Sequence, residues 1–426
     1  MQLSSSEQQH WIGDRLLLYG VLAFWCVVLG AFSLHRIVVS NDSLSNYAHV
    51  WYIADRLQTG NGIPYHFPGL AHGEALTFPY AAVPWLTAAL LRPLLGDWVV
   101  TAWLLLGFLG LLAAVWAAFP ELRRPLPAAV FLVNPFLIEA VLLFQLPFVW
   151  ATAFLFAAVA AWRRQRVFLA TLLAALCQST HPAVAAPLLG CLVLVALPFE
   201  PRRVRLLAAY AAATALSLPA AWMTLSSPTF SDAGLGATLV NFVATVGLRS
   251  AVVVAGPLLA WVSPRLSPAV LRGVFVASCA LSVVLVPLQP TDYAWGALRR
   301  QPDHDLAPYL ASAAFTPGAV YRVLRAHDGK VTMYQVLQSG GVLDSEFFPE
   351  SFARRSWGSI EDYRAFLDER QVDVVLLFPS YTDRFRTNEA DLLAALTAEG
   401  CATRLADEDA YAAISVTRCR QHPNAP

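Results

Sequence analysis

Residues 98–118 read WVVTAWLLLGFLGLLAAVWAA, a stretch without a single charged side chain. A helix needs about 20 apolar residues to cross the hydrocarbon core of a bilayer. The whole chain shares this character, because 57% of its residues are hydrophobic and only 14% are charged. Soluble proteins carry about 25% charged residues. The sequence therefore predicts an integral membrane protein.

Similar apolar runs lie on both sides of this stretch, separated by short turns that carry arginines. The predicted spans are 16–34, 98–118, 126–144, 146–162, 167–180, 182–199, 206–225, 237–262 and 269–289. We therefore expect a mainly α fold, a polytopic transmembrane bundle of about nine spans. This module takes up residues 1–290 and includes a long first outer loop over residues 36–95.

Arginine clusters set the expected orientation, because cytoplasmic loops of membrane proteins are enriched in basic residues. The clusters are Arg123/Arg124, Arg163/Arg164/Arg166, Arg202/Arg203/Arg205 and Arg265/Arg272. All four are cytoplasmic if the N-terminus is cytoplasmic and residues 79–95 form an interfacial or re-entrant helix instead of a span. Three prolines within 79–95 favour this interpretation. We therefore expect a multi-pass protein of the cell membrane with an extracytoplasmic C-terminal domain.

The C-terminal region, residues 291–426, has a different pattern and predicts a small α/β accessory domain. Strands are expected at Val331–Leu337, Val372–Phe378 and Ala410–Val416, and helices at Ser359–Glu369 and Asn388–Leu396. Ser359 and Asp362 form a capping box at the start of the first of these helices. Cys401 and Cys419 also lie here, and whether they form a disulfide depends on an oxidising compartment.

The first outer loop carries the strongest candidates for chemistry. Ser40-Asn41-Asp42-Ser43 predicts the start of a helix over Leu44–Leu57. Asp42, Asn46 and His49 follow the spacing i, i+4, i+7 and so share one face. The complementary face is apolar, which suits a helix that lies along the membrane surface. Helix capping alone is the structural alternative for Asp42.

Three further polar residues lie within the bundle or at its outer turns. Glu139 stands inside an apolar span, where an ionisable side chain costs about 2.5–3.5 kcal/mol to insert and usually faces a cavity or a partner. Its structural alternative is a bond to another helix, with Asn134 as a polar neighbour. Gln145 and His181 fall at outer turns, where simple exposure to water is the alternative to a role in a site.

Two short motifs carry a resemblance to a known family. The first loop reads Asn41-Asp42-Ser43-Leu44-Ser45-Asn46-Tyr47-Ala48-His49-Val50-Trp51, an acidic residue followed by His and Trp, and Phe78-Pro79-Tyr80 with Pro84-Trp85 closes the loop. With the arginine-punctuated bundle and the outer α/β domain, this layout resembles the GT-C superfamily of polytopic glycosyltransferases, in particular a bacterial branch. The resemblance implies inverting transfer of a sugar from a polyprenyl-phosphate donor to a glycan or glycolipid acceptor of the cell envelope.

The resemblance also implies roles for residues. Asp42 matches the general base that takes the proton of the acceptor hydroxyl, and His49 is a candidate to orient the acceptor or donate to the phosphate. A phosphate leaving group needs cationic groups near the membrane surface, so Arg56 and Arg92 are candidate ligands. Glu139, Gln145 and His181 complete the expected substrate-binding set. No second acidic residue stands beside Asp42, and a divalent metal ion is left open as a cofactor.

Other classes of function remain as alternatives. The net charge of zero gives no indication of a nucleic-acid partner. A catalytically inactive partner in envelope assembly would use the C-terminal domain for binding. A lipid or solute transporter is the other alternative, although the sequence has no inverted repeat and no paired glycine-broken spans.

Overall fold

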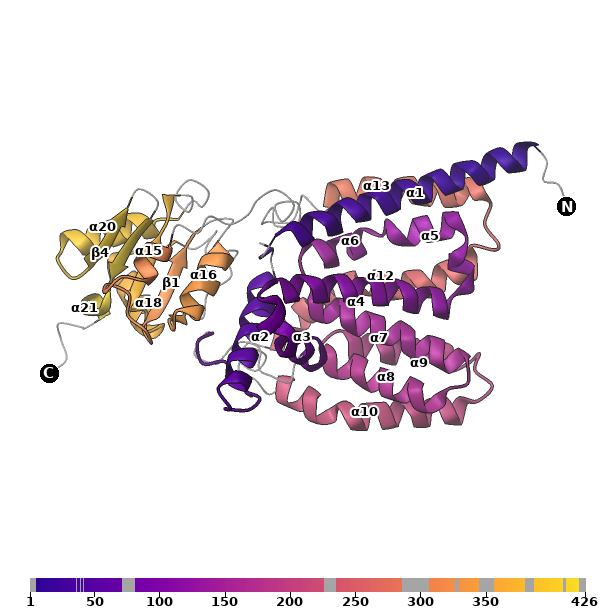
Figure 1. Cartoon of the computed structure of the whole chain (residues 1–426), viewed down its shortest axis with the longest axis horizontal. Helices are drawn as coiled ribbons and strands as arrows, with labels where there is room; N and C mark the ends of the chain where they lie inside the picture. The colour runs from indigo at the N-terminus through magenta and orange to yellow at the C-terminus, as the bar shows by residue number, and fades with distance from the viewer. Residues whose placement is uncertain are drawn as a thin grey trace.

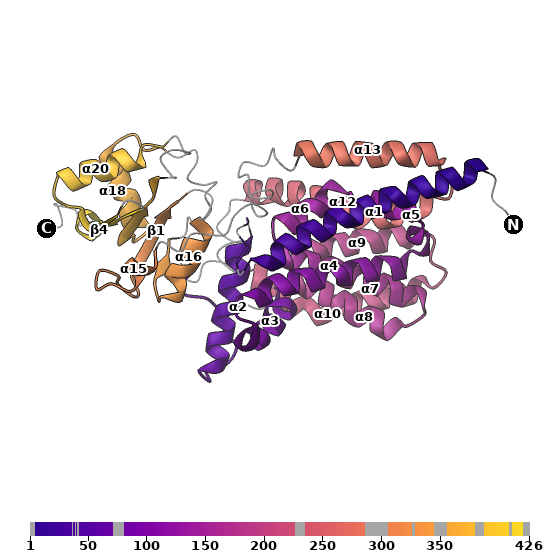
Figure 2. The same ribbon diagram turned by 45° about the horizontal axis from the view of Figure 1, so that its top comes forward.

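The computed structural model describes residues 5–35, 37–38, 40, 42–70, 81–225, 235–285, 306–325, 329–344, 356–379, 387–408 and 411–420. These residues form a mainly helical protein with a small sheet in the C-terminal region. Figure 1 shows the long helices gathered in one bundle, with the C-terminal domain beyond one end and the N-terminus at the opposite end. Figure 2 shows the same arrangement from a second direction.

Each predicted span is largely helical over the residues that the structure describes. The helices are α1 (Ser5–Leu34), α4 (Trp98–Ala118), α5 (Pro125–Leu132), α6 (Pro135–Leu142), α7 (Leu146–Arg163), α8 (Val167–Thr180), α9 (Ala185–Ala196), α10 (Arg203–Leu225), α12 (Leu235–Val262) and α13 (Pro268–Leu285). Within the described residues, α1, α4, α7 and α10 are long and apolar enough to cross a membrane, and the bent pair α5–α6 makes a fifth candidate. With 14 and 12 residues, α8 and α9 are shorter than a full span, so the number nine stays a prediction.

The predicted span 126–144 is not one continuous helix. It consists of α5 and α6, which meet at an angle of 51°. The break falls at Asn134-Pro135, because proline has no amide proton and disfavours a helical residue before it. The Asn134 side chain restarts the helix by accepting a hydrogen bond of 3.0 Å from the backbone N–H of Phe136.

Side chains of other helices supply donors to the carbonyls at this break. The Trp25 indole N–H of α1 donates to the Leu132 carbonyl at 3.1 Å, and the Ser282 hydroxyl of α13 lies 3.3 Å from the Val133 carbonyl oxygen. Irregular backbone inside a membrane protein is tolerated where protein groups replace the missing helical bonds. Helix α1 therefore stabilises the broken segment through the Trp25 indole, and α13 packs against it near Ser282.

The two ends of the bundle differ in charge. At the end away from the C-terminal domain, Arg163 donates to the carbonyl of Ala118, and Arg272 pairs with Asp14 at 2.7 Å. The first contact joins the ends of α7 and α4, and the second joins α13 to the N-terminal part of α1. The predicted clusters therefore collect at one end, and the opposite end carries α2 (Ser43–Gln58), α3 (Ala82–Leu95) and the C-terminal domain.

Residues 82–95 form the short helix α3, which Figure 1 shows nearly end-on beside bundle helices that run across the view. Residues 79 and 80 of the predicted segment lie outside the described residues. A helix of 14 residues is too short for a full span. Helix α2 forms as predicted. Both its predicted polar face and its apolar face are buried, since it packs between the bundle and helix α16 (Gly329–Gln338).

The C-terminal domain is a mixed α/β layer. Its strands are β1 (Val320–Leu324), β2 (Val342–Leu343), β3 (Val374–Leu377), β4 (Thr403–Glu408) and β5 (Tyr411–Ser415), and its other helices are α15 (Ala307–Leu310), α18 (Ile360–Glu369), α20 (Glu389–Ala398) and α21 (Thr417–Arg420). The sheet order is β2-β1-β3-β5-β4, with β1 parallel to β2 and β3, and β5 antiparallel to β3 and β4. The predicted strands at 372–378 and 410–416 and both predicted helices are confirmed, and Ser359 caps α18 by accepting from the Asp362 amide.

The predicted strand Val331–Leu337 is wrong, because these residues belong to helix α16. Val331, Tyr334 and Leu337 are all buried at a spacing of three, which fits one face of a helix. Tertiary topology explains the difference, since two parallel neighbours such as β1 and β2 need a crossover, usually a helix.

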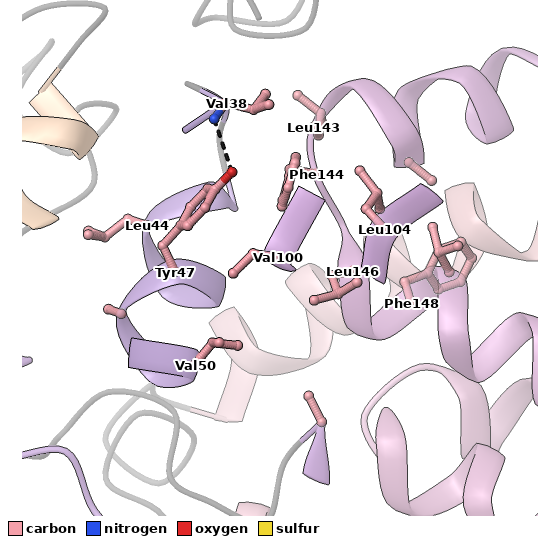
Figure 3. Packing of buried hydrophobic residues seen from close by; sticks show 14 of the residues in the cluster. Val38, Leu44, Tyr47, Val50, Val100, Leu104, Leu143, Phe144, Leu146 and Phe148 are labelled. Atoms are coloured by element: carbon pink, nitrogen blue, oxygen red, sulfur yellow. Dashed lines mark hydrogen bonds between the residues drawn. The ribbon is translucent and has the colours of Figure 1, made fainter. Parts of the chain in front are cut away.

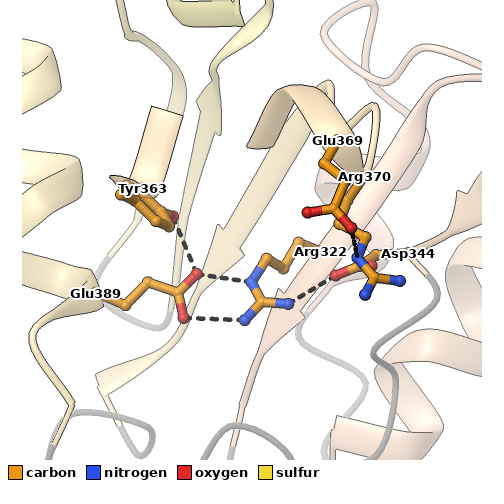
Figure 4. A network of polar contacts seen from close by, with 6 residues as sticks. All are labelled: Arg322, Asp344, Tyr363, Glu369, Arg370 and Glu389. Atoms are coloured by element: carbon orange, nitrogen blue, oxygen red, sulfur yellow. Dashed lines mark hydrogen bonds and ion pairs between the residues drawn. The ribbon is translucent and has the colours of Figure 1, made fainter. Parts of the chain in front are cut away.

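Two features fix the interior of this domain. Cys401 and Cys419 form a disulfide, so the option left open by the sequence is settled for this structure. Figure 4 shows fully buried Arg322 of β1 between two carboxylates, Glu389 at 2.6 Å and Asp344 at 2.6 Å, with the Tyr363 hydroxyl donating to Glu389. A buried arginine needs such partners, because an unpaired charge there would be strongly destabilising.

Candidate functional site

The candidate residues of the first loop lie at the bundle end that faces the C-terminal domain. The backbone N–H of Asp42 donates to the Leu143 carbonyl at 3.1 Å, and the Ser40 hydroxyl donates to the Leu142 carbonyl at 2.6 Å. Figure 3 shows Tyr47 of α2 packed beside Phe144, with ring centroids 5.7 Å apart. The start of α2 is thus fixed to the turn between α6 and α7.

Asp42 occupies the N-cap position of α2, yet its side chain makes no capping hydrogen bond. The adjacent serines make the local bonds instead, since Ser43 Oγ donates to the Ser40 carbonyl at 2.7 Å and accepts from the Ser40 amide at 3.1 Å. Asp42 is partly exposed. Helix capping therefore does not explain why an aspartate stands at this position. The positive end of the helix dipole favours a negative charge there.

Asn46 ties three parts of the chain together at this position. Its amide Nδ2 donates to the carbonyls of Asp42 at 2.8 Å and Phe144 at 2.9 Å, and its Oδ1 accepts from the Trp85 indole at 2.9 Å. The side chain is buried, so these three bonds replace its contacts with water. Asn46 therefore holds α2, the turn before α7 and α3 in one arrangement.

The side chain of His49 is buried. Its ring stacks on Trp85, with centroids 4.1 Å apart and an interplanar angle of 13°. Its Nδ1 lies 2.7 Å from the Ser45 carbonyl oxygen. A carbonyl only accepts, so Nδ1 carries a proton and donates. The ring is thus fixed in orientation by one stacking partner and one hydrogen bond.

His181 lies at the same end of the bundle, just after α8. The residue before it, Thr180, is bonded to the start of α3, because the backbone N–H of Ala81 donates to the Thr180 carbonyl at 3.2 Å. Nε2 of His181 lies 3.2 Å from Nη1 of Arg249. The Arg249 guanidinium lies 5.3 Å from the centroid of the Phe148 ring. The structure thus brings a cation to this end that sequence reasoning missed. A single arginine inside the apolar run 237–262 was the signal that could have found it.

The two arginines predicted as phosphate ligands are placed differently. Arg92 forms an ion pair with Asp97, through Nη2 at 2.8 Å and Nε at 3.1 Å. Arg56 lies near the far end of α2 and donates to the Asn61 carbonyl at 3.1 Å. The structure does not join either arginine to the Asp42 start of α2, and Arg92 already has a carboxylate partner.

Glu139 and Gln145 lie on either side of the Leu143 turn. Glu139 is a partly exposed residue of α6 whose backbone carbonyl accepts from the Leu143 amide, and Gln145 is the buried N-cap of α7. Asn134, the expected polar neighbour of Glu139, instead donates to the Ala251 carbonyl at 3.2 Å. Both residues therefore lie at the Asp42 end of the bundle.

Metal ligation was left open by the sequence. Over the part of the chain that the structure describes, no group of three or more His, Cys, Asp or Glu side chains is placed to hold a metal ion. The motif residues Phe78, Pro79 and Tyr80 lie outside this part, whereas Pro84 and Trp85 belong to α3.

Comparisons with known proteins do not assign this chain to a family. No protein-family model matches it, and the search of curated proteins found no match either.

Proposed function

We propose that this chain is an inverting membrane glycosyltransferase of the GT-C type, with a polyprenyl-phosphate sugar as donor and a cell-envelope glycan or glycolipid as acceptor. The observation that carries the proposal is the position of Asp42. Its carboxylate is partly exposed at the bundle end, is not used for helix capping, and has a backbone fixed by Leu143 and Asn46. A positioned carboxylate of this kind is what a general base requires.

Two observations support an extracytoplasmic position for this end. The arginine clusters gather at the opposite end of the bundle, which the positive-inside tendency places in the cytoplasm. The disulfide between Cys401 and Cys419 favours an oxidising compartment for the C-terminal domain. The N-terminus would then be cytoplasmic, and the donor and acceptor would meet on the outer face.

The chemistry assigned to the site is one displacement. The acceptor oxygen forms a bond to the anomeric carbon while the bond from that carbon to the phosphate oxygen breaks, and the hydroxyl proton passes to the Asp42 carboxylate. The lipid phosphate leaves with its additional negative charge. Arg249 beside His181 is a better candidate to stabilise this charge than Arg92, because Arg92 is already paired with Asp97.

The test is sugar transfer by the purified full chain in lipid vesicles supplied with a polyprenyl-phosphate sugar and an acceptor. We expect Asp42→Asn to lower kcat by about 100-fold or more, since general bases contribute roughly 10²–10⁴ in rate. Asp55→Asn is the matched control, because Asp55 is an exposed carboxylate on the same helix, and it should retain activity. Full activity of the Asp42→Asn protein would refute the assignment of the base.

The broken segment α5–α6 is the one observation that favours a transporter, since discontinuous helices form substrate sites in many transporters. The same vesicles separate the two functions. Uptake of a lipid or solute without any sugar transfer would replace the proposed function by transport.

A further inference from the structure

The C-terminal domain contacts the membrane module through a polar cluster that the proposed site does not use. The Tyr334 hydroxyl of α16 donates to Oδ1 of Asp97 at 2.7 Å, and the same Asp97 pairs with Arg92 of α3. Asp97 is 2% exposed and Tyr334 is fully buried. Burial raises the pKa of Tyr334 well above its ordinary value, so the phenol keeps its proton and donates to the carboxylate.

The same tyrosine also touches the helix that carries Asp42. The rings of Tyr334 and Tyr47 lie 5.8 Å apart. The Tyr47 hydroxyl in turn lies 2.9 Å from the Thr101 hydroxyl of α4 and accepts from the Val38 amide at 3.1 Å. One side chain of the C-terminal domain therefore contacts α2 and, through Asp97, the junction between α3 and α4.

A second contact joins the main chains. The Leu343 amide of β2 donates to the Gly69 carbonyl at 2.8 Å, and Leu70 forms a parallel bridge with Leu343. The first outer loop thus extends the edge of the C-terminal sheet. Gly69 is closely enclosed, because an added Cβ would lie 3.0 Å from Phe67 and 3.2 Å from Leu337.

We propose that the C-terminal domain is a clamp for α2, with Tyr334 and Asp97 as positioning residues for the transfer reaction. The clamp holds the first outer loop at two points, Tyr47 on α2 and Gly69, and so sets where Asp42 stands relative to the bundle. Its catalytic part rests on the proposed function, whereas its structural part does not.

The bond from Tyr334 to the buried, arginine-paired carboxylate of Asp97 is what distinguishes this contact from simple apolar packing. Buried charges add little net stability, but removing one partner is costly, and such groups are best attested as devices that select one arrangement. Asp97 receives its guanidinium partner from α3 and its phenol partner from α16, so docking of α16 has to bring Tyr334 to this carboxylate. This requirement selects a single orientation of the domain on the outer loop.

The test compares two tyrosines with the same chemistry. Tyr334→Phe removes a hydroxyl that donates to an arginine-paired carboxylate across the contact. Tyr363→Phe removes one that donates to arginine-paired Glu389 within the C-terminal domain. Spin labels on cysteines at exposed Asp55 and Glu361, in a protein whose free cysteines are replaced, report the distance between α2 and the domain by pulsed electron resonance.

We expect Tyr334→Phe to broaden this distance distribution and to lower kcat about 10- to 100-fold, since small misplacements of reacting groups have effects of this size. The KM for the donor should change by no more than about twofold, because donor binding does not involve the clamp. Tyr363→Phe should leave both readouts unchanged. Gly69→Val is a second variant that disturbs the clamp from the loop side without altering the domain, and it should act like Tyr334→Phe.

The outcomes separate the clamp from the proposed reaction. A broadened distance in the Tyr334→Phe protein supports the structural clamp even if the wild-type vesicles transfer no sugar, in which case the proposed function fails alone. An unchanged distance in both Tyr334→Phe and Gly69→Val overturns the clamp. Equal losses of kcat in Tyr334→Phe and Tyr363→Phe, with unchanged distances, overturn the positioning role.

Discussion

Replacing Asn46 by alanine should destabilise the membrane module by about 2–6 kcal/mol. The variant removes the acceptor of the Trp85 indole, and losing the partner of a buried donor costs about 1–3 kcal/mol. The carbonyls of Asp42 and Phe144 each keep a main-chain donor, from the Asn46 and Leu146 amides. Their lost side-chain bonds therefore cost only about 0.5–1.5 kcal/mol each.

Asn46→Asp should lower the free energy of unfolding more than Asn46→Ala does. Aspartate places a carboxylate oxygen where the amide nitrogen now donates to two carbonyls. An ionised carboxylate can only accept, so acceptors would face one another in a buried place. The expected order of unfolding free energies is therefore wild type, then alanine, then aspartate.

The assay is reversible unfolding in mixed detergent micelles, followed by the loss of helical circular dichroism. Asn61→Ala is the matched control, because Asn61 is an exposed residue just beyond α2 whose amide bonds only to Thr59. The Asn61→Ala variant should change the free energy of unfolding by less than about 0.5 kcal/mol. Equal effects of Asn46→Ala and Asn61→Ala would refute the role of Asn46.

Two further outcomes follow from packing and covalent structure. Gly107→Ala should cost about 1–3 kcal/mol in the same unfolding assay, since its Cβ would lie 2.7 Å from the Trp150 indole nitrogen. Gly110→Ala, whose Cβ meets nothing within 4 Å, should be nearly neutral. Cys401→Ser should destabilise the C-terminal domain by about 3 kcal/mol, because the bond to Cys419 closes a loop of 18 residues. Thiol labelling of both cysteines in untreated protein would contradict this last prediction.

The helices of the bundle could be predicted from apolarity alone, but their continuity could not. The predicted spans form helices because long apolar runs have few other structures open to them in a bilayer. The break in 126–144 was overlooked although the dipeptide Asn134-Pro135 is a turn signal. The apolar composition around it outweighed that signal.

Some contacts of the candidate site could likewise be predicted from the sequence, and others could not. The spacing of Asn46 and His49 on one helix predicted a shared face, and both side chains contact Trp85. The ion pair of Arg92 was not predicted, because it depends on the way α3 turns into α4. The contact between Arg249 and His181 joins residues 68 positions apart, and no local pattern encodes such a pair.

The C-terminal domain shows how tertiary context overrides composition. Val331–Leu337 is rich in residues that favour strands, and this composition outweighed the helical spacing of Val331, Tyr334 and Leu337. The need for a helix at residues 331–337 becomes clear only once β1 and β2 are known to be parallel neighbours. Local signals at Ser359 and Asp362 were reliable because a cap involves only residues within one turn.

The broken segment has a consequence for how the chain is made. Helix α13 packs against both α5 and α6, and its Ser282 hydroxyl lies 3.3 Å from the carbonyl oxygen of Val133, which stands 149 residues earlier in the chain. A ribosome-bound intermediate that ends before α13 already contains α5 and α6 but lacks this packing. Packing around the break is therefore completed only when α13 arrives, and chains truncated before Ser282 should be preferred targets of membrane quality control.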